Sequence, residues 1–158
     1  MPHIDLPPLP GIAALLAGHP RTGGPLSSLA EALLRGPSPL TAAERETIAA
    51  YVSRGNECTF CAETHGAVAR QLGATDPDPR LRALLAIADK VRVDGRTVSA
   101  DDVAAARAAG ADDQAIHDTV LIAAAFCMYN RYVDGLATLP ATDYDGHARR
   151  LTDHGYLA

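Results

Sequence analysis

Two of the three cysteines in this 158-residue chain lie three positions apart, with a histidine close behind them. The stretch reads GNECTFCAETHG, and it contains Cys58, Cys61 and His65. On an α-helix, offsets of three, four and seven residues place all three side chains on one face. Two thiols one turn apart can close a disulfide, and exposed N–H groups at a helix start favour a thiolate. The spacing therefore predicts a redox dithiol with a neighbouring imidazole base.

Zinc binding and an inert structural pair are the two alternative interpretations of these residues. The C-x2-C-x3-H pattern supplies three metal ligands, whereas a structural zinc site takes four. The chain has no second CxxC or paired histidine to complete a tetrahedron. Three ligands on one continuous helix also suit zinc poorly. We therefore expect no metal at these residues and favour the redox dithiol.

The elements that must position these residues are helices separated by Pro and Gly, and strand patterns are nearly absent. The spacing of apolar residues and the capping signals predict helices at 26–34, 41–54, 57–72, 80–91, 103–109 and 114–136. Abundant alanine favours close approach of helices. The predicted fold class is therefore all-α, a bundle packed around a CxxC-bearing helical hairpin.

The sequence also predicts three segments along the chain. The first is a flexible N-terminal segment at residues 1–24, in which several prolines surround one short apolar patch from Ile12 to Leu16. A helical domain follows at residues 25–139. The polar C-terminal tail at residues 140–158 has room for one short helix around His147 to Leu151.

Composition bounds the classes of function. Apolar residues make up 47% and charged residues 21% of the chain, which is ordinary for a globular protein. The net charge is −5, the basic residues are scattered, and there is no Trp for base stacking, so we expect no nucleic-acid partner. The longest apolar run, at 120–129, is about half of a membrane span, and the N-terminus lacks a signal pattern. A cytoplasmic protein without a membrane partner is expected.

A base that cycles its proton usually needs an acid to orient it. Glu46 lies early in the helix predicted at 41–54, and Gly55 and Asn56 turn the chain back into the CxxC helix. In an antiparallel hairpin, an early residue of the first helix faces the later turns of the second. Glu46 is therefore expected to face His65.

The segment LTAAERETIAAYVSRGNECTFCAETHGAVARQLG resembles the carboxymuconolactone decarboxylase-like superfamily, in particular its alkylhydroperoxidase (AhpD-like) branch. The matching pattern is E-x11-C-x2-C-x3-H, which is met by Glu46, Cys58, Cys61 and His65, and the similarity extends over residues 40–138. The resemblance implies an all-helical fold that assembles into trimers or hexamers. It also implies reduction of organic hydroperoxides or hydrogen peroxide without metal, flavin or haem, with electrons from an external thiol or dithiol.

The resemblance also implies a role for each site residue. Cys61 attacks the peroxide and becomes a sulfenic acid, which Cys58 resolves to a disulfide, while Glu46 and His65 relay protons. The helix dipole alone would instead favour Cys58 as the thiolate, and we follow the family order because His65 lies one turn from Cys61. Phe60 departs from the best-known alkylhydroperoxidases, which have a second histidine there. In this respect the chain resembles the peroxidase-related members.

Other candidates follow further along the chain. Asn130, Arg131 and Asp134 form a polar cluster, interpreted either as a buried Arg–Asp tie between helices or subunits or as a polar wall beside the dithiol. Cys127 is expected to be a small buried hydrophobic residue, and His147 belongs to no catalytic constellation. Two alternative functions stay open: a non-redox lyase like the decarboxylase that names the superfamily, and a redox-sensing assembly module without catalysis.

Overall fold

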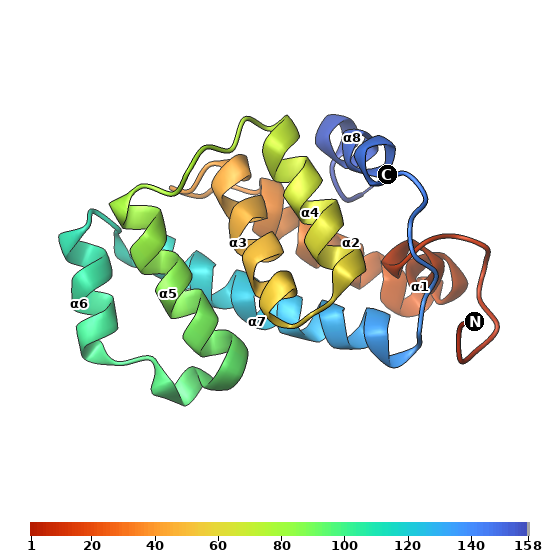
Figure 1. The fold of residues 1–158 in the computed structure, drawn as a ribbon, viewed down its shortest axis with the longest axis horizontal. Coiled ribbons are helices and arrows are strands. Elements are labelled where there is room, and N and C mark those ends of the chain that lie inside the picture. Colours follow the sequence, from red (N-terminus) through yellow and green to blue (C-terminus); the bar gives the residue numbers. More distant parts are fainter. Residues whose placement is uncertain (158) are drawn as a thin grey trace.

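Eight α-helices and one short 3₁₀ helix account for the secondary structure of residues 1–157, which this computed structural model describes (Figure 1). The α-helices are α1 (Ile12–Gly18), α2 (Pro20–Arg35), α3 (Ala42–Gly55), α4 (Thr59–Gln71), α5 (Pro79–Asp94), α6 (Ala100–Ala108), α7 (Asp113–Gly135) and α8 (Tyr144–His154). The 3₁₀ helix η1 covers Gly95–Thr97. No strand lies among these residues, so the predicted all-α class is confirmed. None of their helices is long and apolar enough to cross a membrane.

Helices α3 and α4 form the hairpin that carries the dithiol. α3 begins with the predicted capping box, in which Thr41 and Glu44 each bond to the other's backbone N–H. The α4 helix begins two residues later than the sequence predicted, because Glu57 adopts a left-handed φ of 60° that interrupts the helical path. Cys58 is therefore the N-cap of α4, and Cys61 lies in its first turn.

The long helix α7 runs along the length of the molecule behind this hairpin (Figure 1). It packs against both α3 and α5. Ile48 of α3, Leu84 of α5 and Ile122 of α7 are fully buried in the main apolar cluster. Burying a side chain of this size contributes about 1.5–3 kcal/mol to the free energy of unfolding. This cluster therefore holds α3, and with it the hairpin, against α5 and α7.

Two helices occupy residues 12–35, where the sequence predicted flexibility as far as residue 24 and a helix only from Leu26. Pro20 stands at the first position of α2, where its missing N–H costs nothing. Pro25 lies inside α2, and the packing of α2 against α3 and α7 stabilises a helix that local propensity disfavours. The sequence-based helix start was wrong because tertiary contacts outweigh propensity here. The proposed division of the chain into three segments stays a prediction.

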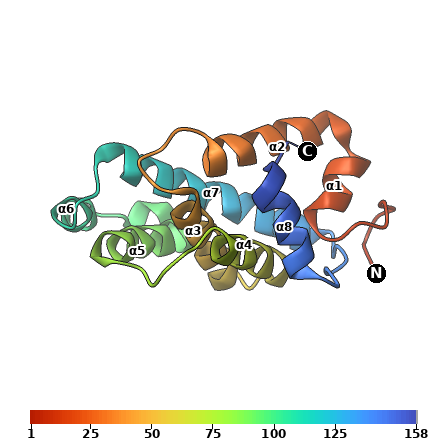
Figure 2. The ribbon, with the colours of Figure 1, turned by 90° about the horizontal axis from the view of Figure 1, so that it is seen from above.

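The C-terminal segment packs over the dithiol hairpin. Helix α8 is longer than the turn or two predicted around His147, and it packs against α4. Gly155 ends it with a φ of 72°, a conformation that glycine adopts without steric cost. The chain then turns towards α2, where the N–H of Tyr156 donates to Glu31 Oε2 at 2.7 Å. Figure 2 shows this end of the chain beside α2.

Candidate active site

The two cysteines of the motif differ in what they face. Both are present as free thiols and both are buried, with 0% of Cys58 and 4% of Cys61 exposed. Cys61 lines the cavity described below, whereas Cys58 does not and packs with Leu15 and Val133. A ligand in the cavity therefore meets the sulfur of Cys61 and not that of Cys58.

The pKa values of the two thiols are also shifted in opposite directions. A hydrogen bond from Cys58 lowers the pKa of Cys61, and the nearby charge of His65 lowers it further against the effect of burial. The same hydrogen bond, together with burial, raises the pKa of Cys58. This geometry favours a thiolate at Cys61 with Cys58 as its proton-bearing donor. The N-terminal position of Cys58 on α4 is outweighed by these contacts.

His65 and Glu46 are in direct contact across the hairpin, as expected from the sequence. His65 Nδ1 lies 2.7 Å from Glu46 Oε2, and the carboxylate is fully buried. Burial alone would raise the pKa of Glu46, but the charge and hydrogen bond of His65, with smaller effects of Tyr156 and Arg35, hold it below its usual value. With Nδ1–H donating to the carboxylate, Nε2 of His65 is left to accept a proton.

Two residues that sequence reasoning missed complete the surroundings of Glu46. Arg35 Nη1 donates to Glu46 Oε1 at 2.8 Å, and the hydroxyl of Tyr156 donates to the same oxygen at 2.6 Å. The guanidinium of Arg35 lies 5.2 Å from the centre of the Tyr156 ring. No local signal could have found these residues, because Tyr156 is 110 positions from Glu46 and no fixed spacing links them.

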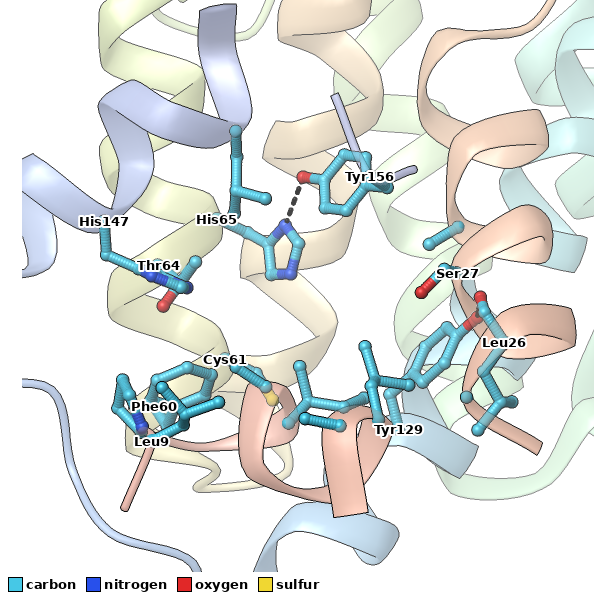
Figure 3. Close-up of a pocket in the computed structure, with 18 of the residues that line it drawn as sticks. Leu9, Leu26, Ser27, Phe60, Cys61, Thr64, His65, Tyr129, His147 and Tyr156 are labelled. Atoms are coloured by element: carbon cyan, nitrogen blue, oxygen red, sulfur yellow. Dashed lines mark hydrogen bonds between the residues drawn. The ribbon is translucent and has the colours of Figure 1, made fainter. Parts of the chain in front are cut away.

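A largely apolar cavity of about 630 Å³ opens beside Cys61 and His65 (Figure 3). Residues of α1 and α2 form one wall, and α4, α7 and α8 supply the others. Its apolar lining includes Leu16, Leu26 and Phe126. Cavities of this size and polarity are typical of binding sites for small organic molecules.

His147 of α8 also lines this cavity, although the sequence placed it in no constellation. Its ring centroid lies 5.7 Å from that of Phe60. Burial lowers the pKa of His147, and the nearby charges of Arg150 and His65 lower it further. A second imidazole therefore reaches the site from α8, and sequence spacing gave no indication of it.

Phe60, between the two cysteines, is held by a close approach of the N-terminal segment. It is buried and lines the cavity. Gly11 lies against its ring, and a Cβ at that position would be 2.1 Å from Phe60 Cε1. The φ of Gly11 is also positive, at 53°. Glycine is thus required there both for space and for backbone conformation.

The predicted cluster of Asn130, Arg131 and Asp134 divides in the structure. Asn130 is buried and donates to Ser53 Oγ at 2.9 Å, and its hydrogen bond to Cys61 contributes to the lowered pKa of that thiol. Arg131 and Asp134 are exposed and form no ion pair with each other among the described residues. Within this chain the two side chains are not tied to each other, and a tie between subunits stays a prediction. Asn130 and Asp134 are one helical turn apart, and the charge of Asp134 raises the pKa of both thiols, whereas Arg131 donates to Cys127 O of its own helix.

Cys127 lies on α7. It is partly buried, and its sulfur accepts a hydrogen bond from Asn56 Nδ2 at 3.5 Å. Within residues 1–157, no group of three or more His, Cys, Asp or Glu side chains is arranged to hold a metal ion.

Comparison with known proteins places these features in a wider group. Residues 20–89 match the model of the carboxymuconolactone decarboxylase family. An uncharacterized peroxidase-related protein from Silicibacter sp. TM1040 superposes with a TM-score of 0.83 at 25% identity, over 92% of this chain and 94% of that one. A second structure is described as an alkylhydroperoxidase AhpD core, an uncharacterized peroxidase-related protein from Ralstonia eutropha JMP134. It superposes with a TM-score of 0.77 at 29% identity, over 89% of this chain and 82% of that one. No curated protein matches the chain.

Proposed function

Because the chain belongs to the carboxymuconolactone decarboxylase/AhpD-like superfamily, we propose that it is a CxxC-dependent hydroperoxide reductase. The observation that carries the proposal is the position of Cys61. It lines an apolar cavity, it accepts a hydrogen bond from Cys58, and it lies near an imidazole that is paired with a buried carboxylate. A nucleophile, a resolving thiol and a proton relay are the groups that dithiol peroxide chemistry needs.

The reaction starts with the thiolate of Cys61 attacking the terminal oxygen of a hydroperoxide. The S–O bond forms as the O–O bond breaks, and the leaving alkoxide takes a proton from the relay of His65 and Glu46. Cys61 is then a sulfenic acid. The sulfur of Cys58 attacks it, water leaves, and the Cys58–Cys61 disulfide results. An external thiol or dithiol supplies the two electrons and two protons that restore both thiols.

The cavity supports an organic hydroperoxide as the substrate in preference to hydrogen peroxide. Its volume of about 630 Å³ is far larger than a hydrogen peroxide molecule needs, and its lining is mostly apolar. An organic group that fills this space gains from burial about 25 cal/mol per Å² of apolar surface. We expect bulky hydroperoxides to have a higher kcat/KM than hydrogen peroxide.

Assembly and location extend the same proposal. The superfamily resemblance supports a homo-oligomer, either a trimer or a hexamer. We place the protein in the cytoplasm, where an external thiol or dithiol partner would reduce the Cys58–Cys61 disulfide after each reaction. The exposed side chains of Arg131 and Asp134 are available to such an interface.

Mass spectrometry of the peroxide-treated protein tests the chemistry. One equivalent of cumene hydroperoxide is expected to remove two hydrogens, located at a Cys58–Cys61 disulfide. Cys58→Ser should instead accumulate a sulfenic acid at Cys61, and Cys61→Ser should consume no peroxide. Cys127→Ser is the matched control and should behave like wild type. Unchanged thiols in the treated wild type would refute the proposal, and lactone turnover by the Cys58→Ser/Cys61→Ser double variant would support a lyase in its place.

A further inference from the structure

We propose that Tyr156 is a positioning residue for the Glu46–His65 pair, so that the C-terminal end of the chain completes the active site. The inference rests on the proposed function, but it concerns a segment outside the motif and outside the residues matched by the family model. Three sets of contacts of Tyr156 support it: those of its hydroxyl, those of its ring and those of its backbone.

The hydroxyl of Tyr156 determines how Glu46 uses its two oxygens. It donates to Oε1 at 2.6 Å, and Arg35 Nη1 donates to the same oxygen at 2.8 Å. These two donors leave Oε2 for His65 Nδ1, at 2.7 Å. A carboxylate bound on both oxygens cannot rotate, so its direction towards the imidazole is fixed.

The ring of Tyr156 limits the movement of His65. The two rings are nearly parallel, with an interplanar angle of 16° and centroids 6.0 Å apart, and the hydroxyl lies 3.3 Å from His65 Nδ1 (Figure 3). On another side, Phe126 meets the imidazole edge-on, with centroids 4.7 Å apart. His65 is therefore held between two aromatic side chains, with Nδ1 directed at Glu46.

The backbone around Tyr156 is built to bring the side chain to this place. Its N–H donates to Glu31 Oε2 at 2.7 Å, which ties the segment to α2. Gly155 has a φ of 72°, and a Cβ there would lie 2.6 Å from the same carboxylate oxygen. The guanidinium of Arg35 lies over the phenol ring. An unanchored tail residue would have none of these constraints.

Removing the hydroxyl of Tyr156 should reduce thiolate formation at Cys61, because His65 links the two groups. Without the hydroxyl, Glu46 loses one of three donors and His65 is held less firmly, so the imidazole is less well placed to take the proton of Cys61. The titratable groups around this pair are Arg35 and Glu31 of α2, Arg45 of α3, and His147 and Arg150 of α8, and the charge of Asp134 of α7 acts on Cys61. Tyr156→Phe replaces none of these side chains and keeps the ring, so a change in thiolate formation reports the loss of the hydroxyl.

The test is the pH dependence of Cys61 alkylation by iodoacetamide, measured by peptide mass spectrometry in Tyr156→Phe and in wild type. Loss of one typical hydrogen bond changes an equilibrium constant by about three- to tenfold, and we expect an effect of this size because the lost bond acts on Cys61 only through His65. We expect the alkylation rate of Cys61 at neutral pH to fall by about this factor and the midpoint of the profile to move to higher pH. A merely structural role of Tyr156 would not move this midpoint.

Tyr144→Phe is the matched control, because this tyrosine lies in the same helix-and-tail segment but outside the cavity and the relay. It should reproduce the wild-type profile. A chain ending at Gly155 should show at least the effect of Tyr156→Phe. A profile of Tyr156→Phe that coincides with that of wild type would overturn the inference. Since alkylation needs no peroxide, a shifted profile in a protein that reduces no hydroperoxide would reject the proposed function alone.

Discussion

At the scale of single residues, the best-defined feature of the site is the carboxylate of Glu46. It has no exposed surface, yet it is ionised, because His65, Tyr156 and Arg35 all donate to it. A buried charge is tolerated only when it is paired and hydrogen-bonded in this way. The stability of the fold and the orientation of His65 therefore depend on the same group.

The lowered pKa of Glu46 predicts how stability changes with pH. A carboxyl whose pKa is lower in the folded state contributes stability above its unfolded value, near 4.5, and this contribution is lost as the pH falls through the folded value. Wild type should therefore lose free energy of unfolding on acidification below about pH 4.5. Glu46→Gln should be less stable at pH 7, by on the order of 2 kcal/mol, and its stability should vary less across this window.

Urea denaturation between pH 7 and pH 3 measures this difference. Glu63→Gln is the control, because Glu63 is exposed on α4 and its removal should leave the wild-type pH profile unchanged. Parallel pH profiles for Glu46→Gln and wild type would contradict the assignment of Glu46 as an ionised buried group.

Thr64 of α4 has a buried hydroxyl that lacks the hydrogen bond made by other helical threonines. Three other helical threonines, Thr47, Thr119 and Thr152, donate their hydroxyls to the carbonyl four residues earlier. Thr64 is 2% exposed, and its hydroxyl has no hydrogen-bond partner among the described residues. An unpaired buried hydroxyl costs about 1–3 kcal/mol, so Thr64→Val should raise the free energy of unfolding by about 1 kcal/mol.

Thr119→Val is the matched substitution, because Thr119 is equally buried but its hydroxyl is bonded. It should lower the free energy of unfolding by about 0.5–1 kcal/mol. Equal effects of the two substitutions in urea titrations would show that the hydroxyl of Thr64 is satisfied in solution.

At the scale of elements, the start of α4 depends on a contact with the N-terminal segment. Gly11 is the N-cap of α1, its N–H donates to Leu139 O at 2.8 Å, and its Cα lies against the ring of Phe60. The loop before α1, the segment after α7 and the first turn of α4 therefore meet at one point. Phe60, next to Cys61, takes its position from this contact.

Gly11→Ala should therefore destabilise the protein and displace Phe60. A methyl group there would overlap the ring, and the positive φ is unfavourable for alanine, so we expect a loss of about 2 kcal/mol or more. Gly24→Ala in α2 is the comparison, because a Cβ there meets nothing within 4 Å. That substitution should stabilise by about 0.5–1 kcal/mol. Thermal or urea unfolding measures both, and a neutral Gly11→Ala would contradict the close approach.

At the scale of the whole molecule, the cavity exists because separate parts of the chain enclose it. Helices α1 and α2 precede the dithiol hairpin, and α7 and α8 follow it, yet all of them contribute to its walls. The hairpin alone would present Cys61 to solvent. The remaining helices determine that Cys61 lines a largely apolar cavity, and thereby limit the size of molecule that can reach it.

The sequence by itself determined what depends on neighbouring positions. Helical periodicity, the capping box at Thr41 and the spacing from Glu46 to His65 act over one hairpin, so the fold class and the Glu46–His65 contact could be predicted. Helix starts at Pro20 and Thr59 could not, because packing and a left-handed residue decided them. Only the tertiary structure brought Tyr156, Arg35 and His147 to the site and turned Cys61, but not Cys58, towards the cavity. These contacts join residues up to 110 positions apart, and no local pattern encodes them, because they form only when the helices pack.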